Sequence, residues 1–337
     1  MNSSIYPQKL PNIRIIATGG TIAGVAERKT QTSGYKAAQV SIGDLLAEIP
    51  DTDDLANITS EQFCQIGSEN MTEVIWLELA RHINNLLKSD DIDGIVITHG
   101  TDTLEETAYF LNLTVKSSKP VVIVGAMRPA TALSADGPLN LFDAILVAAN
   151  RQSYGKGVLV CFGNMIISAR EATKTSTYQT NTFQGRGFGC IGAIVANAVL
   201  YYYNTTKKHT LESVFSIDGV NELPKVEIVY QYAGSRENMV KTAIELGVDA
   251  VVVAGFGGGN FNDDLSGYVK SLGEKPVIVR STRVTSGAVV RNGDINDDEH
   301  GTIAADDLSP QKARILVMLA LLKTRNTDEI QKYFYEY

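Results

Sequence analysis

Four apolar runs in the first half of the chain predict buried strands. The runs are continuous and rich in β-branched residues, which is typical of parallel strands covered on both faces. They are Asn12–Thr18, Gly94–His99, Pro120–Ala126 and Gly157–Phe162.

Amphipathic stretches between these runs predict helices over residues 72–88, 103–115 and 138–149. In the first stretch, apolar residues recur at spacings of four and three, which places them on one helix face. These residues are Ile75, Leu79, Ile83 and Leu86. Regular alternation of strands and helices predicts a three-layer α/β fold.

The same alternation begins again near Val226. Strands are expected over residues 226–230, 250–254 and 276–280, and helices over 239–246, 264–272 and 310–323. Between the halves, residues 201–224 are first aromatic and then polar, without a sustained period. We therefore expect a larger N-terminal α/β domain over residues 1–200 that carries the site, a linker over 201–224, and a smaller C-terminal α/β domain over 225–337.

Composition narrows the classes of function. The 337 residues are 44% hydrophobic and 20% charged, which excludes disorder as the main state, and the net charge of −8 disfavours nucleic acids and anionic membranes as partners. No run reaches the ~18 apolar residues that a membrane span needs. Because the N-terminus has no signal-peptide pattern, we expect a cytoplasmic protein, or a periplasmic or secreted one if a leader was removed.

The sequence predicts neither a metal nor a cofactor. Three widely spaced cysteines and four histidines form no zinc pattern. The glycine-rich segment Thr18–Gly24 matches neither the dinucleotide motif nor the phosphate loop.

Ligands of open α/β sheets bind at the carboxyl ends of the strands, so the segments that follow the apolar runs are the candidate sites. After the first run, Thr21 lies in a glycine-rich turn and is either a nucleophile or a helix cap. The polar segment Glu27–Lys36 that follows is either a lid with Tyr35 at its tip or a surface loop.

The turn Thr98–Thr103 is the strongest candidate. Thr103 and Glu106 fit a capping box, but capping leaves Thr101 and Asp102 unexplained. A helix N-terminus favours anions and an aspartate favours ammonium groups, so this turn suits a zwitterion such as a free amino acid.

Two further segments have both a structural and a functional interpretation. Before the 72–88 helix, Asn70 or Thr72 is expected as the N-cap, while Ser68 and Glu69 are candidates for binding the polar end of the ligand. Lys174 is a solvated side chain by default, or a base if it lies near a threonine.

Taken together, these segments resemble the bacterial-type L-asparaginase family, in its type II branch. The resemblance covers nearly the whole chain in the same order. It rests on Thr18–Gly24, His99–Thr114, Gly125–Leu141, Thr173–Thr175, Ala254–Asn260, Arg280–Gly287 and Pro310–Arg314.

The resemblance implies hydrolysis of L-asparagine to L-aspartate and ammonia through a threonine acyl-enzyme, with secondary activity on L-glutamine. It makes Thr21 the nucleophile and gives Tyr35 a part in its activation. It assigns Thr101, Asp102 and Lys174 to a second catalytic group. Ser68 and Glu69 match the positions that hold the α-carboxylate and α-amine, and Asp102 also takes the amine.

The resemblance further implies a homotetramer, a dimer of intimate dimers, in which the C-terminal domain completes the neighbouring subunit's site. Asn260 and Asp294 match the residues that the neighbour contributes. Two positions depart from the family pattern: Asp294, where glutamate is frequent, and Glu69, where many members have glutamine. Both are expected to change the preference between asparagine and glutamine.

Three alternatives to a selective asparaginase remain. The first is a glutaminase-asparaginase with comparable activity on both amides, because one methylene changes discrimination by only ~1–3 kcal/mol. The second is a non-catalytic amino-acid binding protein on the same scaffold, which the complete set of threonines and lysine disfavours. The third, the amide-hydrolysing subunit of a transamidation complex, would call for an RNA-binding or partner-binding domain that this acidic chain does not show.

Overall fold

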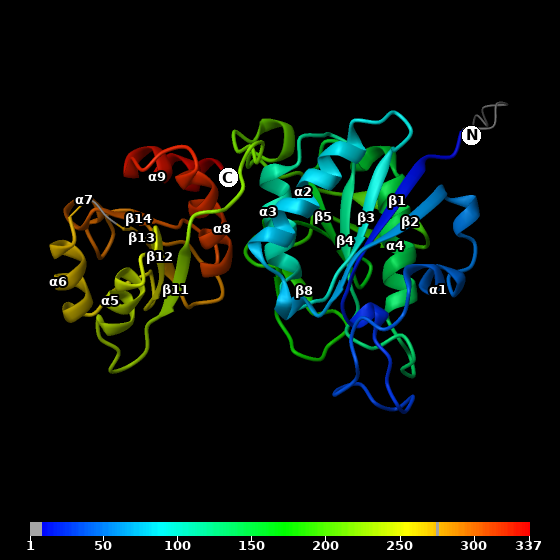
Figure 1. Cartoon of the computed structure of the whole chain (residues 1–337), viewed down its shortest axis with the longest axis horizontal. Coiled ribbons are helices and arrows are strands. Elements are labelled where there is room, and N and C mark those ends of the chain that lie inside the picture. The colour runs from blue at the N-terminus through cyan, green and yellow to red at the C-terminus, as the bar shows by residue number, and fades with distance from the viewer. Residues whose placement is uncertain (1–8, 274–275) are drawn as a thin grey trace. The chain divides into compact units, whose positions relative to one another are not determined.

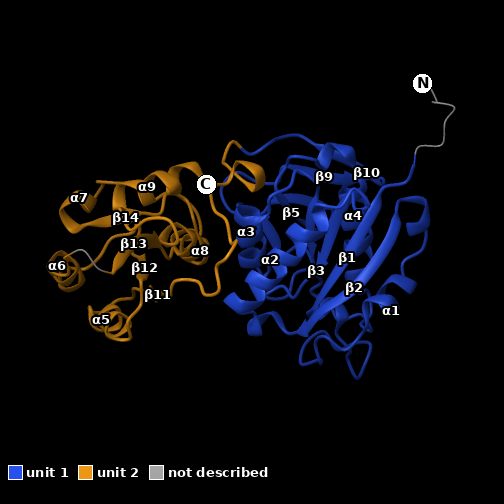
Figure 2. Cartoon of the chain, turned by 45° about the horizontal axis from the view of Figure 1, so that its top comes forward, with its two compact units in different colours: residues 1–205 blue, residues 206–337 orange. Residues whose placement is uncertain are grey.

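The computed structural model describes residues 9–273 and 276–337, and the chain divides into two compact units, residues 1–205 and 206–337 (Figure 2). Each unit is an α/β structure with its own sheet, the larger one N-terminal. The predicted two-domain α/β fold class is confirmed. The expected linker 201–224 begins at the end of the last strand of unit 1 and lies mostly in unit 2.

Unit 1 is built on an eight-stranded sheet with the order β10-β9-β6-β5-β4-β3-β1-β2 (Figure 1). Its strands are β1 (Asn12–Gly19), β2 (Asn57–Ile66), β3 (Gly94–Thr98), β4 (Val121–Val124), β5 (Val158–Phe162), β6 (Met165–Ser168), β9 (Gly192–Val195) and β10 (Ala198–Tyr201). Strands β1 to β5 are parallel, and β6, β9 and β10 continue the sheet as antiparallel strands. A separate hairpin pairs β7 (Ala172–Lys174) with β8 (Phe183–Gly185).

Four α-helices cover the two faces of this sheet. They are α1 (Ile42–Ala47), α2 (Glu73–Leu87), α3 (Leu104–Thr114) and α4 (Gly137–Ala149). Apolar residues of α1 and α4 form one core with the sheet face that carries Ile13, Ile15 and Ala17. Helices α2 and α3 pack together on the opposite side (Figure 1). Both faces are therefore buried, which explains why the parallel strands are continuously apolar.

Strand β2 was not predicted, because its sequence is polar. It is an edge strand that pairs only with β1, and most of its side chains are partly or fully exposed. An edge strand with a solvated face needs no apolar run, so it carries little hydrophobic signal.

Unit 2 is a four-stranded parallel sheet with the order β11-β12-β13-β14. Its elements are β11 (Val226–Tyr230), α5 (Asn238–Glu245), β12 (Ala250–Gly255), α6 (Asp263–Ser271), β13 (Val277–Thr282), α7 (Asp297–His300), β14 (Thr302–Ala304), α8 (Pro310–Leu321) and α9 (Thr327–Glu336). Helices α5 and α6 share a core with β11, β12 and β13, and α8 packs against the same three strands.

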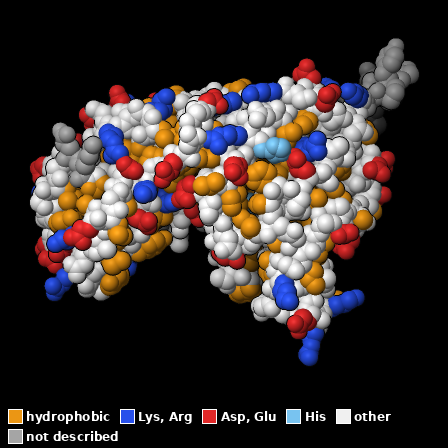
Figure 3. All heavy atoms as spheres, in the orientation of Figure 1, with side chains coloured by type: hydrophobic (Ala, Val, Ile, Leu, Met, Phe, Trp, Pro, Cys, Tyr) orange, Lys and Arg blue, Asp and Glu red, His pale blue; other side chains and the backbone are white. Residues whose placement is uncertain are grey.

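The surface carries both signs of charge. On the face drawn in Figure 3, Lys and Arg side chains lie singly or in small groups among acidic and apolar ones. Within residues 9–273 and 276–337, no helix combines the length and apolar character needed to cross a membrane.

Candidate functional site

Thr21 lies in a tight turn at the carboxyl end of β1. Gly19 and Gly20 have φ angles of +108° and +83°, which glycine adopts without the strain that a side chain would cause. The turn continues as a single 3-10 turn, Thr21–Ala23. Thr21 Oγ1 lies 2.8 Å from the Tyr35 hydroxyl, and either oxygen can be the donor.

Tyr35 is held in place by the loop that carries it. Val25 and Lys36 exchange two backbone hydrogen bonds at the base of the loop, at 2.9 and 3.1 Å. Within the loop, Gln31 Nε2 donates to the carbonyls of Ser33 and Gly34, each at 3.0 Å. The segment is thus a hydrogen-bonded loop with Tyr35 against Thr21.

The environment of Tyr35 keeps its hydroxyl protonated. Burial raises the pKa of Tyr35, the hydrogen bond to Thr21 lowers it, and the negative charges of Asp102, Asp136 and Glu69 raise it further. The net shift is upward from 10.0, so at neutral pH the group is a phenol that both donates and accepts hydrogen bonds.

A second polar cluster follows β3. Lys174 Nζ donates to Thr101 Oγ1 at 2.9 Å and to Asp102 Oδ1 at 2.6 Å. Lys174 and Asp102 form an ion pair in which the aspartate side chain is 63% exposed. The default interpretation of Lys174 as a solvated side chain is therefore wrong, because its side chain is only 20% exposed and its ammonium group donates to two predicted site residues.

The backbone of Lys174 is anchored separately. Lys174 ends β7, where it pairs with Phe183 of β8, and its backbone N–H donates to Glu105 Oε2 at 2.8 Å. Glu105 is buried in the first turn of α3 and was not predicted as a site residue.

Ser68 joins the Thr101 turn to the segment before α2. Its hydroxyl oxygen accepts from the Asp102 N–H at 3.1 Å, and its carbonyl accepts from Thr103 Oγ1 at 2.8 Å. Thr103 is the N-cap residue of α3, as expected, but its side chain makes no capping hydrogen bond and donates to Ser68 instead. Glu69 follows Ser68 in the 3-10 turn Ser68–Asn70, and its position is exposed.

The N-cap of α2 is Thr72, one of the two residues expected there. Its side chain accepts from the Ile75 N–H.

A cavity of about 530 Å³ brings these groups together in unit 1. Its lining includes four predicted residues, Tyr35, Thr101, Asp102 and Lys174. The remaining lining residues are Thr32, Ser33, Gly34, Met127, Arg128, Thr177 and Tyr178. Thr21 and Ser68 are not among the lining residues, but each forms a hydrogen bond with one of them: Thr21 with the Tyr35 hydroxyl, and Ser68 with the Asp102 N–H.

Only some of these remaining lining residues could have been predicted from the sequence. Met127 and Arg128 follow the carboxyl end of β4, where ligands of parallel sheets bind, so strand position alone could have indicated them. Thr177 and Tyr178 lie in the turn between β7 and β8, for which no pattern in the sequence indicated a strand pair.

Asn260 and Asp294 lie in unit 2. Asn260 Nδ2 donates to Asp294 Oδ2 at 2.8 Å, and the Asn260 backbone forms a bridge with Phe256. The amide oxygen of Asn260 is buried and has no hydrogen-bond partner among the described residues.

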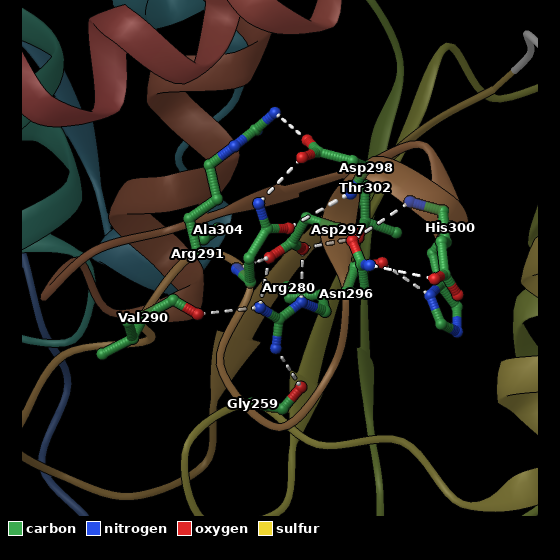
Figure 4. Close-up of polar contacts among 12 residues, drawn as sticks. Gly259, Arg280, Val290, Arg291, Asn296, Asp297, Asp298, His300, Thr302 and Ala304 are labelled. Carbon is green, nitrogen blue, oxygen red and sulfur yellow. Dashed lines mark hydrogen bonds and ion pairs between the residues drawn. The ribbon is translucent and has the colours of Figure 1, made fainter.

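The loops that carry these two residues are tied together by Arg280, which is 1% exposed (Figure 4). Arg280 donates to both carboxylate oxygens of Asp297, at 2.6 and 2.7 Å. It also donates to the carbonyls of Gly259 at 3.2 Å and Val290 at 3.1 Å. The sequence did not indicate this pair, because Arg280 ends an apolar run and its partner lies 17 residues further on.

A second cavity, of about 850 Å³, lies near the amino ends of β1 and β3 and contains none of the predicted residues. Across the described ranges 9–273 and 276–337, no three His, Cys, Asp or Glu side chains form a group suited to a metal ion.

Comparison with known proteins gives consistent results over nearly the whole chain. The family models "Asparaginase, N-terminal" and "Glutaminase/Asparaginase C-terminal domain" match residues 12–207 and 225–334. The chain is 49% identical to L-asparaginase 2 of Bacillus subtilis (strain 168), covering 99% of this chain and 89% of that protein. It is 44% identical to glutaminase-asparaginase of Acinetobacter glutaminasificans, covering 97% and 99%. Among solved structures, a probable cytoplasmic L-asparaginase from Campylobacter jejuni superposes with a TM-score of 0.94 at 45% identity, covering 97% of this chain and 100% of that one.

Proposed function

This chain belongs to the bacterial type II asparaginase family, and from that premise we propose how it hydrolyses the side-chain amide of L-asparagine to L-aspartate and ammonia. It is an amidohydrolase. The observation that supports the proposed route is that Tyr35, which contacts Thr21, lines the same cavity as Thr101, Asp102 and Lys174.

In the acylation step, Thr21 Oγ1 attacks the amide carbon. The carbon–nitrogen bond breaks, and the threonine proton ends on the departing ammonia. The Tyr35 phenol lies 2.8 Å from the attacking oxygen, where it accepts the threonine hydrogen bond and orients a lone pair toward the substrate. The upward pKa shift of Tyr35 keeps this group neutral at the start of the reaction.

The second cluster serves the leaving group and the water. Because Lys174 donates to Thr101 Oγ1, the Thr101 hydroxyl hydrogen is available to point into the cavity. There it donates to the amide during acylation. In deacylation, Thr101 directs the water that attacks the ester, and cleavage of the ester returns the proton to Thr21.

The substrate's charged end is assigned to Ser68, Glu69 and Asp102. Ser68 accepts from the Asp102 N–H, which leaves its own hydroxyl hydrogen for an α-carboxylate. The Asp102 carboxylate has one oxygen engaged by Lys174 and is 63% exposed, so its other oxygen can receive an ammonium group.

A homotetramer, as a dimer of intimate dimers, is proposed as the working assembly, with Asn260 and Asp294 of a neighbouring subunit completing each site. The Asn260 amide oxygen supports a ligand-facing role, since buried polar atoms are rarely left without a partner. Light scattering should give four times the 36.4 kDa chain mass, and a monomer that hydrolyses asparagine at the full rate would reject the shared site.

We propose a cytoplasmic location. The three cysteines are free thiols, as is usual for proteins of a reducing compartment. Relatives include a protein named as probably periplasmic in Haemophilus influenzae and one named as probably cytoplasmic in Campylobacter jejuni. Cell fractionation decides between the two, and recovery of the enzyme in the periplasmic fraction would reject this assignment.

The second candidate function is glutaminase-asparaginase activity with similar rates on both amides. Relatives of that name, at 43% to 44% identity, favour it. The measurement is ammonia release from L-asparagine and from L-glutamine, and equal kcat/KM values would replace the selective asparaginase with this candidate.

The decisive experiment repeats that assay on three variants of the purified protein. Thr21→Ala should lose at least about 10³-fold in kcat, because it removes the hydroxyl that attacks the amide carbon. Thr21→Ser keeps a hydroxyl and should retain part of the activity, and Thr59→Ala, at an exposed position of β2, should behave as wild type. Folded wild type that binds asparagine but releases no ammonia would establish an amino-acid binding protein instead.

A further inference from the structure

Behind the Thr101 turn lies a row of three buried polar side chains that no step above uses. Trp76 of α2 is 4% exposed, and His99 at the end of β3 and Thr107 of α3 are fully buried. Trp76 Nε1 donates to Thr107 Oγ1 at 2.9 Å, Thr107 Oγ1 lies 2.9 Å from His99 Nε2, and His99 Nδ1 lies 2.7 Å from the Gly100 carbonyl oxygen.

The chemistry at the two ends of this row fixes the direction of all three hydrogen bonds. An indole N–H only donates, and a carbonyl oxygen only accepts. His99 must therefore carry its proton on Nδ1, so its Nε2 accepts the hydrogen of Thr107. The donors run in one direction, from Trp76 through Thr107 and His99 to the Gly100 carbonyl.

His99 stays neutral in this row. Burial lowers the pKa of His99 to about 4, against a smaller upward effect of the hydrogen bond to Gly100. At neutral pH the ring keeps the single N–H that the row requires.

Gly100 lies where the two threonine turns meet. A Cβ built on Gly20, the residue before Thr21, would lie 2.3 Å from the Gly100 nitrogen, and a Cβ built on Gly100 would lie 2.7 Å from Ser68 Oγ. Only glycine fits at both positions, so the Gly100 peptide lies close to the Thr21 turn and to Ser68.

We propose that Trp76, Thr107 and His99 are positioning residues that hold the Gly100 carbonyl and thereby set the placement of Thr101 relative to Thr21. The inference rests on the proposed function, in which both threonines act on one amide. All three side chains are buried and the last of them, His99, contacts the Gly100 carbonyl, so they act through the Gly100–Thr101 peptide and not on the substrate.

The test compares Thr107→Val with Thr107→Ser. Valine has the shape of threonine without the hydroxyl, whereas serine keeps the hydroxyl. The matched control is Thr114→Val, because Thr114 is also buried on α3 but donates to the Phe110 carbonyl, away from the threonine turns. Steady-state kinetics with L-asparagine and thermal unfolding are measured for all three.

We expect kcat of Thr107→Val to fall about 10- to 100-fold, since small misplacements of reacting groups have effects of that size, while KM changes less than about threefold. Thr107→Ser and Thr114→Val should both keep kcat within about threefold of wild type. The inference is overturned by unchanged kcat in Thr107→Val, by failure of serine to restore kcat, or by an equal loss in Thr114→Val.

Crystal structures of the Thr107 variants give a reading that does not depend on turnover. The Gly100 carbonyl should be rotated in Thr107→Val and unmoved in Thr107→Ser, and an unmoved carbonyl in both rejects the inference. If wild type releases no ammonia, the proposed function fails on its own, and these structures still decide the role of the row.

Discussion

Lys174–Asp102 in unit 1 and Arg280–Asp297 in unit 2 are ion pairs of equal length, each with 2.6 Å between nitrogen and oxygen, but they differ in exposure. The Lys174 and Asp102 side chains are 20% and 63% exposed, while those of Arg280 and Asp297 are 1% and 0% exposed. The same charge contact therefore occurs once beside a cavity and once inside a closed interior.

The two pairs also differ in how many of their hydrogen-bonding groups are used within the protein. Asp297 accepts from Arg280, from Thr302 Oγ1 and from the Asn292 N–H, and Arg280 also donates to two backbone carbonyls. Asp102 accepts from Lys174 through one oxygen and lines the cavity. A pair with unused acceptors beside a cavity can take up a ligand, whereas a buried pair whose carboxylate oxygens each accept two hydrogen bonds can only join segments of the chain.

Of the changes to these two ion pairs, the largest expected effect on activity comes from removing the cation of the exposed pair beside the cavity, Lys174–Asp102, called the open pair below; the buried pair Arg280–Asp297 is called the closed pair. Lys174→Met removes the donor to Thr101, and we expect kcat for L-asparagine to fall about 10⁴-fold, the upper range for a group that assists proton transfer. The free energy of unfolding should change by no more than about 1 kcal/mol, because Asp102 remains in water. Ammonia release and urea unfolding are the measurements.

The control for this prediction is Lys156→Met in the same unit. Lys156 lies over the Tyr201 ring, 4.5 Å from its centre, and is not among the residues that line the 530 Å³ cavity. Activity retained in Lys174→Met, or lost equally in Lys156→Met, would show that the open pair has no special part in hydrolysis.

Removing the cation of the closed pair should instead reduce stability. Arg280→Met leaves the buried Asp297 carboxylate without its cation, and we expect the unfolding free energy of unit 2 to fall by about 3–5 kcal/mol. Arg280→Met with Asp297→Leu removes both charges and should recover much of that loss. Urea unfolding monitored by circular dichroism measures both changes.

The exposed pair Lys270–Glu299 is the control for the loss of stability expected in Arg280→Met. Its side chains are 46% and 61% exposed, so Lys270→Ala should change the unfolding free energy by less than about 1 kcal/mol. Similar losses in Arg280→Met and Lys270→Ala would mean that burial does not set the strength of the closed pair.

The apolar strands and the two threonine turns could be predicted from the sequence because both are local patterns. β1, β3, β4 and β5 are continuous runs between two layers, and the turns after β1 and β3 are short clusters of threonine, aspartate and glycine. What could not be predicted depends on contacts between distant residues. Arg280 and Asp297 pair across 17 residues, and the Thr103 side chain donates to Ser68, 35 positions away, instead of capping α3.

The contacts of Lys174 could not be predicted from its local sequence either. Nothing in its local sequence separates it from a solvated lysine, and only the β7–β8 hairpin and Glu105, 69 positions away, bring it to Thr101. The role expected for it came from family resemblance, while its contacts came from the tertiary structure.

Asp143 is a carboxylate that is buried, like Asp297, but its hydrogen-bond partner is a neutral group and not a cation. It is 1% exposed on α4 and accepts from Asn164 Nδ2 at 2.9 Å. Burial raises the pKa of Asp143 from 3.8 to about 6, and the hydrogen bond from Asn164 only partly opposes this shift. In Asp297, by contrast, burial also raises the pKa, but hydrogen bonds from Arg280, Thr302 and Asn292 reverse the shift and lower it.

A raised carboxyl pKa in the folded state means that the folded form holds its proton more tightly than the unfolded chain. The contribution of Asp143 to stability is therefore full below pH ~4 and is lost as the pH rises to about 6. Asp143→Asn should remove this loss, raising the unfolding free energy above pH ~6 by up to about 3 kcal/mol with little change at pH ~4. Urea unfolding between pH 4 and pH 8 measures the difference, with the exposed Asp53→Asn as a control that should leave the profile unchanged. A constant difference between Asp143→Asn and wild type across this range would mean that a buried carboxylate without a cation is tolerated here as well as the paired Asp297.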